Sequence, residues 1–109
     1  MSGPFSLEPD ASLAEAATRP ENTWVTVGGI VSTARTMAMP NGARAAVLTL
    51  TDFHASLPVL VLGKVLEHIE PQVDEVILVA GKVTRDERGT TIVAQLVERY
   101  DWGDLRVEE

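Results

Sequence analysis

The sequence predicts an all-β fold: a five-stranded Greek-key barrel with one short helix between strands three and four and a short N-terminal arm. Three observations predict it. Five apolar runs alternate or are rich in β-branched residues, as strands are. One segment between the third and fourth runs has helical spacing instead. Two adjacent glycines, Gly28 and Gly29, interrupt the first run where a small barrel must bend its first strand sharply. A chain of 109 residues has room for one such domain.

Residues 1–23 form the predicted arm. Pro4, Pro9 and Pro20 punctuate it, and Ser12 with Glu15 fits a capping box, in which each residue satisfies a backbone N–H of the other. Pro20 leaves room for about two helical turns. We expect this helix to dock on the domain, with a free tail as the alternative.

The domain itself spans 24–97, and an acidic tail follows at 98–109. The predicted strands are Trp24–Ser32, Ala45–Asp52, Leu57–Leu62, Glu75–Thr84 and Thr90–Val97, with a helix over Lys64–Glu70 that Pro71 ends. Thr33–Ala43 is the predicted loop between strands one and two, with a turn at Pro40–Gly42. Pro58 argues for an edge or bulged position of the third strand.

Alternation assigns the two faces of strands two and three. The predicted core residues are Ala46, Leu48, Leu50, Leu57, Val59 and Val61. The predicted outward residues are Ala45, Val47, Thr49, Thr51, Pro58 and Leu60. The outward patch is therefore small and apolar.

The formal net charge of −7 argues against nucleic-acid binding on long-range electrostatics alone, but the charge is unevenly placed. Residues 1–23 carry four acids against one arginine, and 98–109 carry five acids against two arginines. No acid occurs between Trp24 and Thr51, a stretch that contains Arg35 and Arg44. The negative charge therefore belongs mainly to the two ends.

Enzyme and metal chemistry find no support in the residues. The chain has no cysteine, and its two histidines, His54 and His68, have no clustered carboxylates. No phosphate-binding loop or nucleophile motif occurs. We expect no cofactor, no metal and no catalytic residues, and, with no long apolar run, a soluble cytoplasmic protein without a membrane partner.

The element order is that of the OB-fold. Four stretches in order, VTVGGIVSTART, NGARAAVLTLTD, LPVLVLGKVLEHI and VILVAGKVTRDERGTTIVA, resemble the OB domain of the bacterial DNA polymerase III alpha subunit, within the wider group that includes anticodon-binding domains. The sequence departs from this family in its lysine-poor loop between strands one and two and in Val47, where the family often has an aromatic residue. The resemblance implies binding of single-stranded DNA or RNA, through strands two and three and the one–two and four–five loops.

Carried onto this chain, the resemblance brings the one–two and four–five loops to the same end of the barrel. Phosphates would then meet Arg35, Arg44, Arg85 and Arg88, with Lys82 assisting and with Thr49 and Phe53 lining the groove. Three of these roles have an alternative. The segment from Arg85 to Arg88 would instead be a solvated tip that Asp86 and Glu87 neutralise. Lys82 would instead pair with an acid, and Phe53 would instead be a core residue at the barrel end.

A second hypothesis is a protein-interaction or self-associating module that belongs to a replication or repair assembly. Its surface would comprise Met37, Met39, Val47, Pro58 and Leu60. The methionines alternatively fold back over the barrel mouth. Trp24, Tyr100 and Trp102 are expected to pack the arm and tail onto the barrel, with base stacking as their alternative. Weak, largely sequence-independent binding of single-stranded nucleic acid is the leading prediction.

Overall fold

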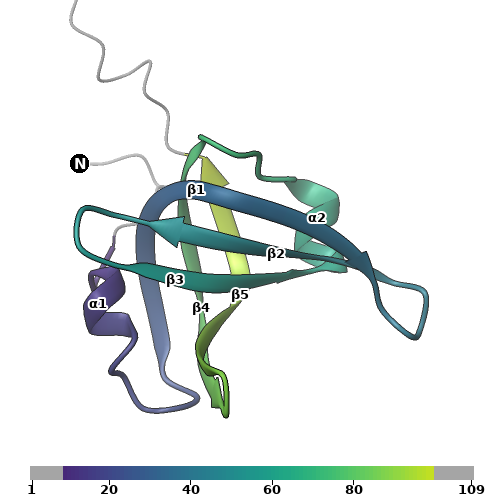
Figure 1. The fold of residues 1–109 in the computed structure, drawn as a ribbon. Helices are drawn as coiled ribbons and strands as arrows, with labels where there is room; N and C mark the ends of the chain where they lie inside the picture. The colour runs from purple at the N-terminus through teal and green to yellow at the C-terminus, as the bar shows by residue number, and fades with distance from the viewer. Residues whose placement is uncertain (1–8, 100–109) are drawn as a thin grey trace, which may run out of the picture.

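The computed structural model describes residues 9–99, and Figure 1 traces their path. The elements are α1 (Leu13–Ala16), β1 (Trp24–Ala38), β2 (Arg44–Thr51), β3 (Ser56–Leu62), α2 (Gly63–His68), β4 (Val76–Asp86) and β5 (Gly89–Arg99). Tyr100 and Trp102, and most of the predicted tail, lie outside the described residues.

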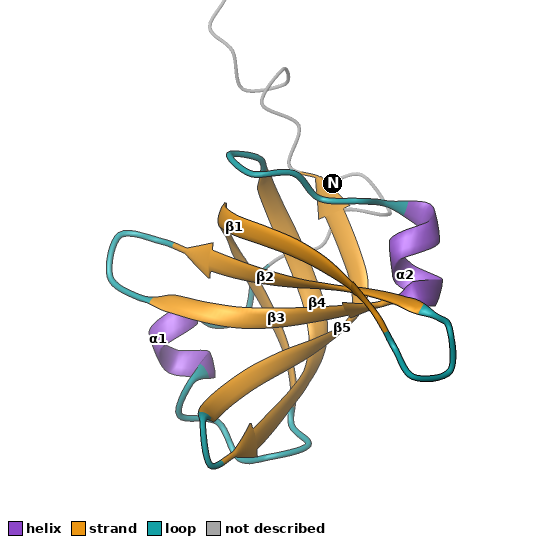
Figure 2. Ribbon diagram, turned by 45° about the vertical axis from the view of Figure 1, so that its right-hand side comes forward, coloured by secondary structure: helices purple, strands orange, loops and turns teal. Residues whose placement is uncertain are grey.

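The five strands close into one barrel in the order β1-β2-β3-β5-β4. All neighbouring strands are antiparallel except β3 and β5, which pair in parallel through Val59–Val61 and Ile92–Ala94. The helix α2 connects β3 to β4 (Figures 1 and 2). This confirms the predicted OB-type barrel, including the short helix between strands three and four.

One strand, β1, takes part in both halves of the barrel. Its first half pairs with β4 from Trp24 to Ile30, and its second half pairs with β2 from Ile30 to Ala38. The change of partner follows Gly28 and Gly29 directly, as predicted. A Cβ on Gly29 would lie 3.0 Å from the carbonyl oxygen of Thr51, so glycine lets the bent strand approach β2 closely.

The core consists of aliphatic side chains from all five strands. Every predicted core residue of strands two and three is buried. On the outward side Ala45 is also buried, contrary to prediction, because its methyl group lies between the larger Met37 and Leu62, its partners in the neighbouring strands.

The arm is part of this core. Leu13 and Ala16 on α1 are fully buried in the barrel's apolar cluster. Ser12 and Glu15 form the predicted capping box, with Ser12 Oγ accepting from the Glu15 N–H at 3.1 Å and Glu15 Oε1 accepting from the Ser12 N–H at 2.8 Å. Asp10 exchanges backbone and side-chain hydrogen bonds with Thr26 on β1. The described part of the arm therefore docks, as predicted.

The predicted loop Thr33–Ala43 is wrong at its start. β1 continues to Ala38 and forms a long hairpin with β2, so that the turn itself comprises only residues 39–43. Residues 32–38 are exposed on both faces, because this half of β1 pairs with β2 and no longer with β4. A strand without a buried face lacks the alternation of apolar and polar residues by which strands are predicted.

Closure of the barrel depends on Gly81, which lies at a bulge between β4 and β5. A Cβ there would lie 2.1 Å from the carbonyl oxygen of Val93, a clash with backbone. We predict that Gly81→Ala lowers the free energy of unfolding by about 3 kcal/mol or more, measured by urea denaturation.

Gly28→Ala is the matched control. A Cβ on Gly28 would meet the end of the Leu78 side chain at 2.8 Å, and a side chain can rotate away. Its effect is expected to be clearly smaller, and equal losses in the two variants would contradict the role given to Gly81.

Candidate nucleic-acid interface

The outward side of β1, β2 and β3 forms a continuous surface, which we term the front face. Strand register places its residues in three rows, each running from β1 across β2 to β3. The rows are Met37–Ala45–Leu62, Arg35–Val47–Leu60 and Thr33–Thr49–Pro58. The front face thus unites residues from both predicted sites: Arg35 and Thr49 from the nucleic-acid site, and Met37, Val47, Pro58 and Leu60 from the protein-interaction surface.

No aspartate or glutamate occurs in β1, β2 or β3. Three neighbouring strands of an acidic protein therefore present a surface without carboxylates, and Arg35 stands in the middle row. The charged side chains of these strands are Arg35 and Arg44, while the acids lie in other elements.

Hydroxyl groups gather at the end of the front face near the β2–β3 turn. Thr33 Oγ1 donates to Thr49 Oγ1 at 2.9 Å. Thr51 Oγ1 donates to Ser32 Oγ at 3.1 Å and lies 3.0 Å from Ser56 Oγ. Hydroxyls both donate and accept, so this cluster suits phosphate oxygens, sugars and base edges alike.

Phe53 lies at the tip of the β2–β3 turn and is 100% exposed, so the alternative that it caps the core is wrong. The turn beneath it is held by Asp52, whose Oδ1 accepts from the N–H groups of His54 at 2.8 Å and Ala55 at 2.9 Å. Asp52 Oδ2 also accepts from the N–H of Leu13 at 3.4 Å. The hydrogen bond from His54, with smaller contributions from Ala55 and Leu13, lowers the pKa of Asp52 below its ordinary value. An ordered turn therefore presents a free aromatic ring.

The Arg85 side chain holds the N-terminal arm by hydrogen bonds. Its guanidinium donates to the carbonyl oxygens of Ala17 at 2.9 Å and Arg19 at 2.7 Å, just beyond the C-terminal end of α1, and its Nε donates to Thr90 Oγ1 at 3.0 Å. Charged donors at the carbonyl end of a helix satisfy acceptors that the helix leaves open. Neither sequence alternative, phosphate clamp or neutralised tip, included this contact.

The other predicted cations are dispersed. Arg44 Nη2 lies 3.7 Å from Glu70 Oε2, near α2. Arg88 is exposed on the β4–β5 turn, where its N–H donates to Asp86 Oδ1 at 2.8 Å. In Figures 1 and 2, α1 and α2 lie on different sides of the barrel, so Arg44 and Arg85 do not meet. The predicted cluster of four arginines is not formed.

Lys82 projects outward from β4. It is exposed between the buried residues Gly81 and Val83, and it pairs in register with Trp24 on β1 and Val93 on β5. Trp24 is 48% exposed.

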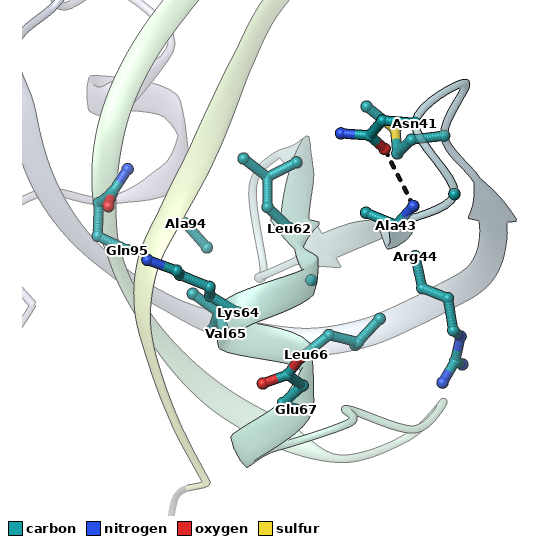
Figure 3. Close-up of a pocket in the computed structure, with 13 residues that line it drawn as sticks. Asn41, Ala43, Arg44, Leu62, Lys64, Val65, Leu66, Glu67, Ala94 and Gln95 are labelled. Atoms are coloured by element: carbon teal, nitrogen blue, oxygen red, sulfur yellow. Dashed lines mark hydrogen bonds between the residues drawn. The ribbon is translucent and has the colours of Figure 1, made fainter.

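An open groove of about 710 Å³ lies beside α2. Figure 3 shows its lining, which comes from the β1–β2 turn, the facing ends of β2 and β3, α2 and β5. Met39, Leu62 and Val65 give it an apolar lining, and Lys64 is its cation besides the paired Arg44. Met39 thus faces this groove while Met37, on the strand, belongs to the front face.

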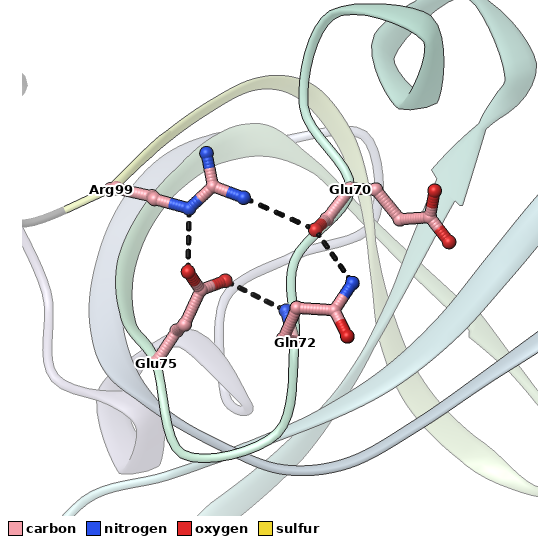
Figure 4. A network of polar contacts seen from close by, with 4 residues as sticks. All are labelled: Glu70, Gln72, Glu75 and Arg99. Atoms are coloured by element: carbon pink, nitrogen blue, oxygen red, sulfur yellow. Dashed lines mark hydrogen bonds and ion pairs between the residues drawn. The ribbon is translucent and has the colours of Figure 1, made fainter.

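A polar network holds the segment between α2 and β4 against the end of β5 (Figure 4). Arg99 Nε donates to Glu75 Oε2 at 2.6 Å, and the Gln72 N–H donates to Glu75 Oε1 at 2.7 Å. Arg99 and Gln72 also donate to the Glu70 carbonyl oxygen, at 3.3 and 3.2 Å. The Gln72 hydrogen bond, followed by Arg99, holds the pKa of Glu75 below its ordinary value.

Within residues 9–99, no group of three or more histidine, cysteine or acidic side chains is placed to hold a metal ion. Among the same residues, no helix is long and apolar enough to cross a membrane. The site is therefore described by its surface charge, hydroxyls and exposed rings.

Neither the known family models nor the curated protein sequences contain a match to the chain. Solved structures do match. The chain is similar to the hypothetical protein ygiW from E. coli (16% identity, 92% of this chain and 97% of that chain covered, TM-score 0.64). It is also similar to a domain of replication protein A from Methanococcus maripaludis (19% identity, 78% and 91% covered, TM-score 0.66) and to a chain of the S. pombe Stn1-ten1 complex (22% identity, 74% and 61% covered, TM-score 0.56). These similarities show an OB-fold barrel.

We predict that Arg85→Gln loosens the arm and lowers the free energy of unfolding by about 1–2 kcal/mol, because charged hydrogen bonds to two carbonyl oxygens are lost. Arg88→Gln, on the adjacent turn, is the matched control and is expected to leave the melting temperature unchanged. Equal melting temperatures for the two variants would contradict the role of Arg85.

Acid should destabilise the protein through Asp52 and Glu75. Their pKa values are lowered in the folded state, so the stability they contribute is present above the ordinary values of 3.8 and 4.5 and is lost as the pH falls through the lower folded values. Melting temperatures measured from pH 6 downward, about one unit at a time, should fall less steeply in Glu75→Gln, which has no carboxylate to protonate there. An identical pH profile for variant and parent would contradict this assignment.

Proposed function

We propose that this chain is a single-stranded nucleic-acid-binding OB-fold protein that acts by binding, without catalysis of its own, in DNA replication or repair. The observation that carries the proposal is the front face without carboxylates in a chain of net charge −7. On this face Arg35 is the phosphate contact, and the hydroxyls of Thr33 and Thr49 contact phosphate or sugar.

Binding on this face is weak and largely independent of sequence. Bases stack on aromatic side chains with little sequence preference, and Phe53 is the exposed ring beside the hydroxyl cluster. Val47 and Leu60 in the middle row offer only apolar contact. Few cations imply few released counterions, so the dependence of affinity on salt is shallow.

The link to replication or repair has two supports. The motif order resembles the OB domain of the DNA polymerase III alpha subunit, and a domain of replication protein A has the same fold as this chain. Both supports are similarities to other proteins, one in sequence motifs and one in fold. The chemical reason to expect nucleic-acid binding is the front face without carboxylates.

The same face supports a second candidate, a protein-interaction or self-associating module. Val47 and Leu60 are direct partners in register, and Met37 and Pro58 flank them in the neighbouring rows. With Met37 40% exposed, this is a contiguous apolar surface of the kind that contacts proteins.

We predict saturable binding of a labelled oligothymidylate or oligouridylate at low salt, measured by fluorescence anisotropy. Log affinity should fall with log salt at a slope of about −0.7 to −1.5, as expected for one or two phosphate contacts at roughly −0.7 each. Arg35→Glu should weaken binding about tenfold or more, because it places a carboxylate in the middle of the front face.

Arg19→Glu, in the arm, is the control with the same change of net charge, and it should retain binding close to that of the parent. Equal losses in the two variants would mean that net charge, and not the front face, determines affinity. No binding of either oligonucleotide at low salt would contradict the proposal and favour the protein-interaction module, which light scattering then tests for self-association.

A further inference from the structure

The middle row of the front face does not end at β3. Leu60 pairs in parallel register with Val93 on β5, Val93 pairs with Lys82 on β4, and Lys82 pairs with Trp24 on β1. Directly opposite residues in paired strands project from the same side of a sheet. The row therefore continues around the outside of the barrel, from Arg35 to Trp24.

Burial confirms that the row faces outward. The row members are exposed or partly exposed, and on β2, β3, β4 and β5 their neighbours along the strand, such as Val59 and Val61 beside Leu60, are buried. The row thus has a cation at Arg35, three aliphatic side chains in its middle, and then a cation and an aromatic ring at Lys82 and Trp24.

The chemistry of the two ends fits one class of ligand. Single-stranded nucleic acid needs cations for its phosphates and π-faces for its bases, and the end at Lys82 and Trp24 supplies one of each on adjacent strands. A row that crosses the strands also gives an extended ligand a path. Five steps between neighbouring strands, at about 4.8 Å each, make an arc of about 24 Å.

We propose that the nucleic-acid site extends along this row beyond the front face and ends at Lys82 and Trp24, where the indole ring of Trp24 stacks on a base. The inference rests on the proposed function and specifies the direction and far end of the site. It assigns Trp24 a binding role in place of the packing role predicted from sequence.

The path implies that ligand length matters. An oligonucleotide bound at Arg35 reaches Trp24 only if it spans the arc, so short strands engage the front face alone. The arc fits the lower end of the range of about 4–16 nucleotides that single OB-folds cover.

The test uses the full chain and its intrinsic fluorescence. Its only tryptophans are Trp24 and Trp102, so a Trp102→Phe background reports on Trp24 alone. A thymidine dinucleotide, which is shorter than the arc, and an oligothymidylate of about 12 nucleotides serve as probes. We expect the longer strand to quench Trp24 fluorescence saturably, with the same midpoint as the anisotropy of a labelled strand.

Trp24→Ala should weaken binding of the longer strand by roughly 5- to 100-fold, the effect of losing one stacked base, and Trp24→Phe should recover most of it. Val73→Ala is the control, because Val73 is 49% exposed, as Trp24 is, but lies between α2 and β4 and away from the row. It should bind as the parent does. Circular dichroism and melting establish that each variant is folded.

The outcomes separate this inference from the proposed function. Binding that Arg35→Glu weakens but that neither quenches Trp24 nor responds to Trp24→Ala overturns the extended path and leaves the front face as the site. Absence of any binding at low salt overturns both. A loss in Trp24→Ala that Trp24→Phe does not recover also contradicts stacking, since phenylalanine keeps an aromatic face.

Discussion

The whole barrel depends on β1 pairing with two different strands. β1 has 15 residues and pairs with β4 through its first half and with β2 through its second half. The change of partner occurs where Gly28 and Gly29 allow the strand to bend. Barrel closure therefore places two distant parts of one strand on the same circuit of paired residues. For this reason the row begins at Arg35 and ends at Trp24, both on β1. In an open flat sheet, a row of paired residues would cross β1 only once.

Charge placement follows from the same architecture. Among residues 9–99 the carboxylates occupy the arm, the turns, α2, the segment before β4 and the ends of β4 and β5, while β1, β2 and β3 carry none. Several acids have structural tasks there: Glu15 caps α1, Asp52 holds the β2–β3 turn, and Glu75 anchors Arg99. Net charge thus describes the chain as a whole and misrepresents the one surface on which a polyanion is proposed to bind.

Much of the barrel could be predicted because its strands have one buried face. Leu48, Leu50, Val59 and Val61 alternate with outward residues, and the capping box at Ser12 is a local signal that needs no tertiary context. The candidate site was less predictable. The front-face rows depend on the register between strands, and the alternation of apolar and polar residues within one strand does not specify that register. The exposed continuation of β1 past Ser32 shows no such alternation. Trp24 illustrates the difficulty, because an aromatic residue at the start of a strand is compatible with either packing or exposure.

Arg85 shows how the arm and the site are connected. A hairpin with three basic residues in an acidic chain invites a functional interpretation, yet the Arg85 guanidinium satisfies the carbonyl oxygens that follow α1, and α1 in turn buries Leu13 in the barrel. The cation in that hairpin that lies on the proposed ligand path is Lys82, three residues earlier on the outward side of β4. The arm also reaches the end of the front face at the β2–β3 turn, since the N–H of Leu13 donates to Asp52 in the turn that presents Phe53. Docking of the arm therefore holds two segments that border the proposed path.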